Sequence, residues 1–60
     1  MPEYFYEQWF DEEENVEITY EYKMTNNRFY CRMHKGEESF KWKRVSGKTY
    51  ASAYESVMNY

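Results

Sequence analysis

The stretch Val16-Glu17-Ile18-Thr19-Tyr20-Glu21-Tyr22-Lys23 alternates strictly between apolar and polar side chains. Its even-numbered residues are β-branched or aromatic, and its odd-numbered residues are charged or Thr. A period of two in such residues predicts a strand with one face buried. Asn26-Asn27 follows, and Asn tolerates the positive φ that a two-residue hairpin turn requires. The run 28–34 alternates again, so we expect a second strand paired with the first.

The register of this hairpin can be checked from the sequence. A turn at Asn26-Asn27 pairs Thr25 with Arg28, and it places Tyr22 opposite Cys31 on the apolar face. The polar face then pairs Glu21 with Arg32, which contributes about 0.2–1 kcal/mol. A slip of one residue would bring apolar side chains onto the polar face, so this register is strongly specified.

A third strand is expected over residues 39–45. Gly36-Glu37 provides a turn with Gly at the first central position, as a type II′ turn prefers. Continued pairing places Met33 opposite Phe40 and Cys31 opposite Trp42. Trp42 is therefore predicted to face the core, while Lys41 and Lys43 lie on the polar face. Ser46-Gly47 ends this strand.

The C-terminal segment changes to helical spacing. Tyr50, Ala53, Tyr54 and Val57 recur at intervals of three or four, which predicts a helix from about Tyr50 to near the end. Thr49 is the expected N-cap. Such a helix would cover the apolar face of the sheet.

Residues 3–10 are aromatic at both parities, so a strand and a helix remain open. A strand is favoured by β-propensity and by the acidic turn that follows. As a strand, it is expected to pair Tyr6 with Tyr20 and Tyr4 with Tyr22. The resulting fold class is α+β: residues 1–60 form one domain, a small antiparallel β-meander of three or four strands packed on one C-terminal α-helix.

The composition sets limits on both stability and function. The chain has 60 residues, no Leu, one Ile and three Val, but 23% of it is aromatic. Because each aromatic side chain buries about 150–250 Å², they can build a thin core with half-exposed Tyr rings around it. The sequence has no apolar span of about 20 residues and no signal-peptide pattern, so no membrane is expected. A single cysteine excludes an internal disulfide and a cysteine zinc site.

Charge is divided unequally along the chain. Residues 1–22 carry eight acidic residues and no basic one, whereas residues 23–50 carry all eight basic residues and two acidic ones. Such asymmetry often marks a charged partner. The net charge of −3 conceals this division.

The candidate binding residues follow from this charge division. On the polar sheet face, basic side chains surround an aromatic ring and the only histidine: Arg28, Tyr30, Arg32, His34, Lys41 and Lys43. This pattern resembles a nucleic-acid platform, although basic side chains on a sheet also serve as solvation and discourage edge pairing. The pI of about 5.1 argues against nucleic acid.

The order of three strands and one helix also resembles the sheet-reading DNA-binding domains of phage integrases. The resemblance concerns the order of elements only, and no residue is assigned through it. It implies binding of DNA through the sheet.

A second candidate is the acidic loop Asp11-Glu12-Glu13-Glu14. It can be a solvated hairpin loop, a competitor for a groove that normally holds nucleic acid, or a site for a hard cation. Calcium loops need alternating ligands and a Gly turn, which four consecutive acids do not supply. No metal and no cofactor is therefore expected.

Three single residues carry further chemical potential. His34 has Thr19 and Ser39 as predicted neighbours, which is not a convincing catalytic triad. An exposed side chain without a role is therefore favoured, and a partner contact is the alternative. Cys31 is predicted to be a buried, inert thiol, since a reactive thiolate needs exposure and a positive setting. Trp9 has no fixed parity and can be core or an exposed anchor.

These observations predict a small non-enzymatic binding protein. Its size, charge and Tyr content are typical of viral or mobile-element (phage) proteins that inhibit a host factor, so we expect a cytoplasmic inhibitor. It would occupy a surface of a host nucleic-acid-handling protein through its charged sheet face and acidic loop. The alternatives are direct nucleic-acid binding by the basic face, and a homo-oligomer in which the acidic half of one copy meets the basic half of the next.

Overall fold

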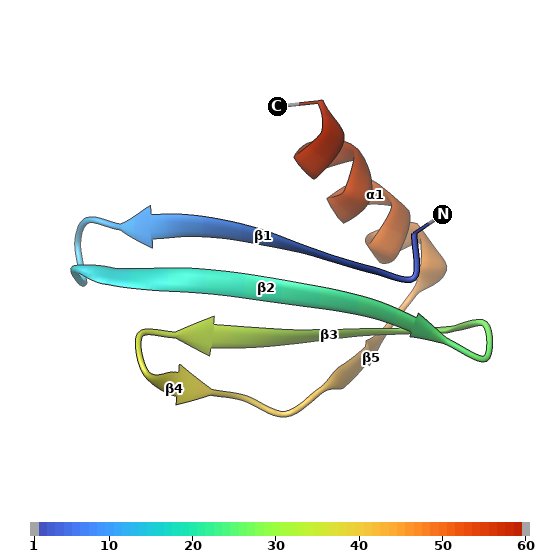
Figure 1. Cartoon of the computed structure of the whole chain (residues 1–60), viewed down its shortest axis with the longest axis horizontal. Coiled ribbons are helices and arrows are strands. Elements are labelled where there is room, and N and C mark those ends of the chain that lie inside the picture. The colour runs from blue at the N-terminus through green and yellow to red at the C-terminus, as the bar shows by residue number, and fades with distance from the viewer. Residues whose placement is uncertain (1, 60) are drawn as a thin grey trace.

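The computed structural model describes residues 2–59 and contains five strands and one helix (Figure 1). In chain order they are β1 (Tyr4–Asp11), β2 (Val16–Thr25), β3 (Arg28–Lys35), β4 (Glu38–Ser39), β5 (Lys43–Val45) and α1 (Gly47–Met58). The strands form one antiparallel sheet in the order β1-β2-β3-β4, and β5 also pairs with β3. The expected α+β class, a meander followed by a C-terminal helix, is confirmed.

The hairpin of β2 and β3 has the predicted register. Thr25 pairs with Arg28, Tyr22 with Cys31, and Glu21 lies opposite Arg32. Asn26 and Asn27 both adopt positive φ, 53° and 60°, as a type I′ turn requires. Alternation and turn chemistry therefore specify the same pairing, which explains why this register is the best defined in the chain.

Residues 4–11 form a strand, so the strand interpretation of the N-terminus is confirmed and the helix is wrong. The expected pairing of Tyr6 with Tyr20 is also wrong, because Tyr6 lies opposite Glu21 and Phe5 lies opposite Tyr22. The loop after β1 is one residue shorter than that pairing assumed, because Asp11 pairs with Val16 and leaves the four residues 12–15, and Asn15 closes the loop with φ of 58°. As a result, the odd-numbered residues of β1 share the face of Tyr22, and Tyr4 and Tyr6 point to the other face.

The segment after β3 is interrupted where one continuous strand was expected. Gly36 has φ of 59°, as the first central residue of a type II′ turn does, and the Phe40 N–H donates to the Met33 carbonyl at 3.0 Å. Beyond this point Cys31 pairs with Lys43 instead of Trp42. Two residues, 41 and 42, thus oppose the single residue 32, which is a β-bulge. The bulge reverses the expected faces of Trp42 and Lys43.

Helix α1 begins three residues before its expected start. Ser46, not Thr49, is the N-cap, and its hydroxyl accepts from the Thr49 N–H at 3.1 Å. The early start is possible because Gly47 lies against Phe29, where a Cβ atom would come within 3.1 Å of the ring. Gly47 therefore lets the first turn of the helix approach the sheet closely.

The core is thin and aromatic, as expected. Tyr50 of α1 is completely buried, and its ring lies 5.0 Å from the ring of Phe5 and 4.9 Å from that of Phe29. The Tyr50 hydroxyl donates to the carbonyl of Pro2 at 2.5 Å, which satisfies its polar atom. Among the described residues, Ile18 and Tyr22 are the other buried apolar side chains.

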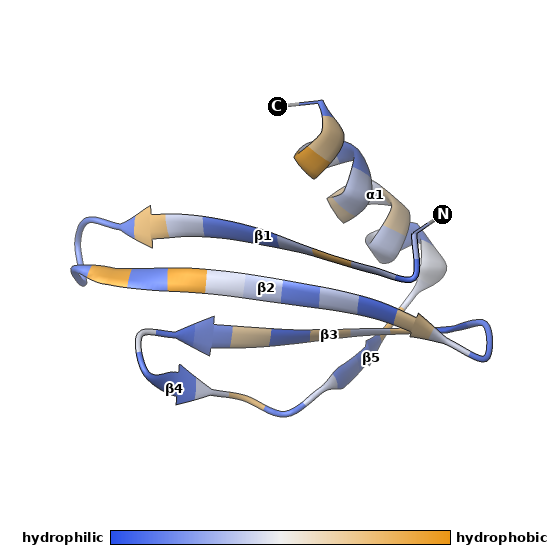
Figure 2. Cartoon of the chain, viewed as in Figure 1, coloured by the Kyte–Doolittle hydropathy of each residue, from blue (hydrophilic) through white to orange (hydrophobic). Residues whose placement is uncertain are grey.

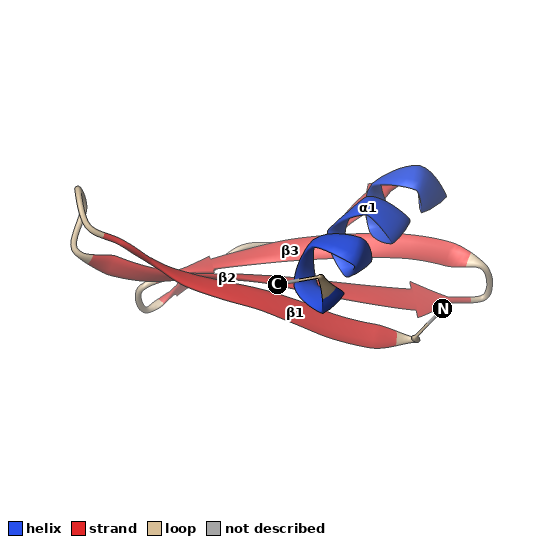
Figure 3. Ribbon diagram, turned by 90° about the horizontal axis from the view of Figure 1, so that it is seen from above, coloured by secondary structure: helices blue, strands red, loops and turns tan. Residues whose placement is uncertain are grey.

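The helix covers one end of one face of the sheet. Figures 1 and 3 show α1 over the end that contains the N-terminus and the β2–β3 turn, so the opposite end is not covered. Figure 1 also shows the C-terminal half of α1 extending past β1, beyond the edge of the sheet. Coloured by hydropathy, β2 has its most apolar bands near the β1–β2 loop, away from the helix, and a weaker one at its other end (Figure 2).

Candidate binding surface

The sheet has one face without a helix, which we call the open face. The alternation of strand side chains assigns to it residues from the three long strands: Tyr4, Tyr6, Gln8 and Phe10 of β1; Glu17, Thr19, Glu21 and Lys23 of β2; and Arg28, Tyr30, Arg32 and His34 of β3. The opposite face, which carries α1, is called the helix-side face. The open face thus brings together four of the predicted basic-face residues: Arg28, Tyr30, Arg32 and His34.

Glu21 is the centre of a polar network on this face. One carboxylate oxygen accepts from Arg32 Nε at 2.7 Å and contacts His34 Nε2, and the other accepts from the Tyr4 hydroxyl at 2.6 Å. Burial alone would raise the pKa of Glu21. The hydrogen bonds from Arg32, Tyr4 and His34 outweigh that effect and lower the pKa to about 2. Arg32 is therefore partly neutralised, and the open face is less basic than its count of cations implies.

His34 lies between two polar partners. Its Nδ1 is 2.8 Å from the Ser39 hydroxyl, and its Nε2 contacts Glu21. The Ser39 neighbour was predicted, whereas the acid was missed. The three side chains have the partner types of a hydrolytic triad, but Ser39 is exposed on a two-residue strand, and Glu21 also serves Arg32 and Tyr4. The arrangement orders His34 within a charged network, so His34 is fixed rather than a free exposed side chain.

Trp42 lies on the open face, which corrects its expected place in the core. Its ring centroid lies 4.2 Å from Lys23 Nζ and 4.5 Å from the Arg32 guanidinium carbon. Lys23 Nζ also lies 5.6 Å from the centroid of Tyr30. The one-residue bulge produces this cation–π cluster, because it turns Trp42 toward the two cations. Nothing in the sequence indicated the bulge.

One of the two lysines of this segment, Lys43, does not join the open face as expected. Lys43 pairs with Cys31 and therefore lies on the helix-side face. Lys41 is exposed in the irregular segment between β4 and β5. The expectation is wrong for Lys43, since it assumed an uninterrupted strand. Lys41 lies where the bulge opposes Arg32, and the two residues line one hollow.

The aromatic residues of β1 are the main part of the open face that the sequence did not identify. Tyr4, Tyr6 and Phe10 are 53%, 53% and 55% exposed. They were expected to lie on the apolar face, and the register shift places them on the open face instead. The signal that could have located them is Asn15, a residue type that tolerates the left-handed φ of 58° found at the end of the four-residue loop 12–15.

The acidic loop is a hairpin loop, as expected. The Asp11 carboxylate accepts from the backbone N–H groups of Glu13 and Glu14 at 3.0 and 3.2 Å, so this side chain shapes the turn. All three glutamates of the loop are exposed, and Glu14 forms an ion pair with Lys35 of β3. The loop closes the end of the sheet far from the cation–π cluster.

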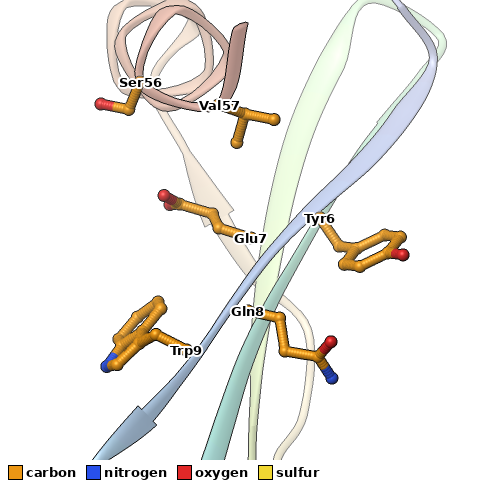
Figure 4. Close-up of a pocket in the computed structure, with 6 residues that line it drawn as sticks. All are labelled: Tyr6, Glu7, Gln8, Trp9, Ser56 and Val57. Atoms are coloured by element: carbon orange, nitrogen blue, oxygen red, sulfur yellow. The ribbon is translucent and has the colours of Figure 1, made fainter. Parts of the chain in front are cut away.

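The helix-side face carries the remaining candidates. Trp9 is 43% exposed and lies against Tyr20, with ring centroids 5.2 Å apart. A hollow of about 550 Å³ lies between β1 and α1, lined by Tyr6, Glu7, Gln8, Trp9, Ser56 and Val57. Figure 4 shows the side chains of Glu7 and Trp9 projecting to the side of β1 on which α1 lies, whereas Tyr6 and Gln8 project to the other side. Trp9 is thus an exposed aromatic beside the edge of the sheet.

Cys31 is half-buried on the helix-side face. Burial raises the pKa of its thiol, and the negative charge of Glu7 acts in the same direction, whereas a hydrogen bond with Tyr22 opposes it. A thiol with a raised pKa is a poor nucleophile at neutral pH. Cys31 is thus half-buried rather than buried, and its low reactivity stays a prediction.

Comparison with protein-family models, with curated proteins and with solved structures finds no match to this chain. Among residues 2–59, no three potential metal-ligating side chains of His, Cys, Asp or Glu lie together. No helix within this range has the length and apolar character needed to cross a membrane.

Proposed function

We propose that this chain is a non-enzymatic protein-binding domain whose contact surface is the open face together with the acidic loop. One observation carries the proposal: Tyr4, Tyr6 and Phe10 lie in a row on the open face, each more than half exposed. Exposed aromatic side chains keep apolar surface in contact with water, which is unfavourable. Burying this surface against a partner therefore contributes favourably to the free energy of binding. Tyr, Trp and Arg are also the residues that contribute most at protein interfaces.

The ordering of the charged groups supports the same function. The Tyr4 hydroxyl donates to Glu21, and Glu21 in turn holds Arg32 and His34. Side chains that are already fixed lose less conformational entropy when a partner binds. The network thus prepares Tyr4 and Arg32 for contact before the partner arrives.

The charge of the surface selects the class of partner. Residues 1–22, which form β1, the acidic loop and most of β2, carry no basic residue. The acidic loop thus gives one end of the contact surface a negative charge, whereas Lys23, Arg28 and Arg32 lie elsewhere on the open face. The acidic end would steer association toward a basic protein surface. Proteins that handle nucleic acid carry basic surfaces of this kind. Our proposal is that the chain occupies such a surface and thereby competes with nucleic acid.

The remaining parts of the proposal concern origin and location. We also propose that the chain inhibits a host factor, is encoded by a virus or mobile element and acts in the cytoplasm. These parts of the proposal rest on the size, charge and Tyr content of the chain. These are analogies of composition, so the partner must be identified by experiment.

The test is capture of partners from a lysate of the source or host cell, with quantification by mass spectrometry. The wild-type chain is compared with Tyr6→Ser, which removes an exposed ring of the open face. Glu55→Gln, an exposed change on α1, is the matched control. We expect one nucleic-acid-handling protein to be captured by the wild-type and control chains, and to be reduced at least about tenfold with Tyr6→Ser. Capture that Tyr6→Ser leaves unchanged, or no specific capture, overturns the proposal.

A second candidate function is direct nucleic-acid binding by the cation–π cluster. The observation that favours it is the position of Lys23 and Arg32 over Trp42, with Tyr30 beside them. Aromatic rings beside cations can stack on bases and contact phosphates. This function predicts a shift of labelled single-stranded DNA or RNA at low salt, weakened by Lys23→Glu and by added salt. The absence of a shift at low salt excludes it.

A further inference from the structure

Strand β1 has one side that pairs with no strand in the described part of the chain, because it is the first strand in the order β1-β2-β3-β4. A free edge presents the N–H and C=O groups of every second residue, which can pair with another strand. At eight residues, β1 is long for an edge strand that is neither bulged nor interrupted by Pro.

The hydrogen-bond pattern identifies the residues that face this free edge. The Met24 N–H donates to the Glu3 carbonyl at 2.9 Å, so residues 3 and 24 form a hydrogen-bonded pair. In an antiparallel ladder such pairs alternate, and the backbone groups of odd-numbered β1 residues therefore point toward β2. The Gly36 N–H donates to the Glu17 carbonyl at 2.9 Å, which gives the complementary pattern between β2 and β3. The backbone groups of Tyr4, Tyr6, Gln8 and Phe10 consequently point outward.

The C-terminal half of α1 lies next to this edge, and a hollow separates it from β1. Figure 1 shows this half extending past β1, and in the view from above its last turn overlaps the ribbons of β1 and β2 (Figure 3). A strand paired with β1 would therefore lie beneath this half of the helix. The hollow of about 550 Å³ between Glu7, Trp9 and Val57 opens at the same place (Figure 4). Side chains of the added strand could fill it.

The two faces of β1 differ, and this difference specifies the chemistry of the added strand. On the helix-side face, Glu7 and Asp11 alternate with Phe5 and Trp9. The Glu7 carboxylate is held by the Tyr22 hydroxyl at 3.0 Å. On the open face, the neighbours are Tyr4, Tyr6, Gln8 and Phe10, none of which is charged. A complementary strand therefore has basic side chains toward Glu7 and apolar side chains toward Tyr6.

We infer that the free edge of β1 binds an extended segment of a partner protein in which basic and apolar residues alternate, by strand addition beneath the C-terminal half of α1. Main-chain hydrogen bonds from the outward backbone groups would supply affinity, and the alternating side chains would supply specificity. The inference rests on the proposed protein-binding function and names the segment that the partner would contribute.

A second copy of this chain is the competing occupant, and its charge is unfavourable. Pairing β1 with itself would bring together two segments that each carry Glu3, Glu7 and the acidic loop, without any basic residue. Like charges placed opposite each other in a sheet are destabilising. Charge complementarity therefore favours a basic partner segment over self-pairing.

The first test uses the full 60-residue chain and a capped octapeptide of alternating Lys and Val as the probe. Amide hydrogen exchange is measured by NMR with and without the peptide. In the free chain, we expect the amides of Tyr6, Gln8 and Phe10 to exchange faster than those of Glu7 and Trp9. At saturating peptide, the first three should become protected at least about tenfold, since each gains a hydrogen-bond partner. Peptides with Glu in place of Lys, or with four Lys followed by four Val, are the controls and should not bind.

The second test changes the edge without changing the ladder to β2. Gln8→Pro removes an outward N–H group and retains the pairing of β1 with β2, as proline on an edge strand can. Gln8→Ala is the matched control, because it removes the same side-chain hydrogen bonds to Glu17 and Thr19 but keeps the N–H. We expect Gln8→Pro to weaken peptide binding at least about tenfold and Gln8→Ala to change it by less than about threefold.

Several results would overturn the inference: no binding of the Lys-Val peptide, binding without protection of the three amides, or protection in the free chain that rises with protein concentration. The last result would identify a second copy as the occupant. The capture experiment with Tyr6→Ser decides the proposed function separately, since a partner could bind the open face without adding a strand. The exchange measurement on the wild-type chain remains decisive even where Gln8→Pro fails to fold.

Discussion

The substitution Glu21→Gln tests the polar network at the centre of the open face. The pKa of Glu21 falls from 4.5 to about 2 on folding, a difference that corresponds to about 3 kcal/mol of stability at pH 7. Because the carboxylate borders the solvent-facing side of the sheet, screening reduces this figure, and we expect a loss of about 1–2 kcal/mol. A lowered pKa stabilises the fold above pH 4.5, and this stabilisation is lost as the pH falls from 4.5 toward 2.

The assay is urea unfolding followed by Trp fluorescence at pH 7 and at pH 3. At pH 7, Glu21→Gln should lower the free energy of unfolding by about 1–2 kcal/mol, and at pH 3 the difference from wild type should fall by more than half. Glu17→Gln is the matched control, because Glu17 lies on the same strand and face but accepts one side-chain hydrogen bond, from Gln8 at 2.6 Å. It should change stability by less than about 0.5 kcal/mol. Equal stability of wild type and Glu21→Gln at pH 7, or a difference independent of pH, would refute the reasoning.

Four further predictions follow from the turns, the helix start and the reactive groups. Asn27→Val should destabilise the chain by about 1–2 kcal/mol in urea, because a β-branched residue is strained at φ of 60°, and an unchanged midpoint would contradict this. Gly47→Ala should lower the melting temperature by several degrees, although Ala has the better helix propensity, because its Cβ would lie 3.1 Å from the Phe29 ring. A higher melting temperature would contradict this and show that the Phe29 ring moves aside. Ser39→Ala should leave the hydrolysis of p-nitrophenyl acetate unchanged, and a rate that depends on Ser39 would reveal a hydrolytic role of the His34 contact. Cys31 should react slowly with a disulfide reagent at pH 7 and faster as the pH rises or urea unfolds the chain, because burial raises its pKa; rapid reaction in the folded state would be inconsistent with this.

The hairpin of β2 and β3 could be predicted from the sequence because two independent signals agree there. The alternation from Val16 to Lys23 fixes which residues share a face, and Asn26-Asn27 fixes the length of the turn. The helix was also predictable from the spacing of Tyr50, Tyr54 and Val57. Its start was not, because Ser46 and Thr49 are both good N-cap residues and the choice depends on the contact between Gly47 and Phe29.

The faces of β1 and of residues 41–45 could not be predicted, for two different physical reasons. Strand β1 has aromatic residues at both parities, so hydrophobic periodicity does not choose a face, and the loop length, four residues instead of five, decides it. In the second segment, a bulge of one residue reverses the side chains from Trp42 onward, and it moves Trp42 to the open face. Both wrong predictions, the face of β1 and the face of Trp42, concern the open face. The number of aromatic side chains on that face was therefore underestimated from the sequence.

The most direct test of the central claim is NMR mapping of the isotope-labelled chain with the captured partner protein. The account predicts that the shifted or broadened signals belong to Tyr4, Tyr6 and Phe10 and to the polar network around Glu21, while the signals of the outer surface of α1, including Ser52 and Glu55, stay unchanged. Shifts confined to α1, or no shift at a concentration that saturates capture, would contradict the assignment of the open face as the binding surface.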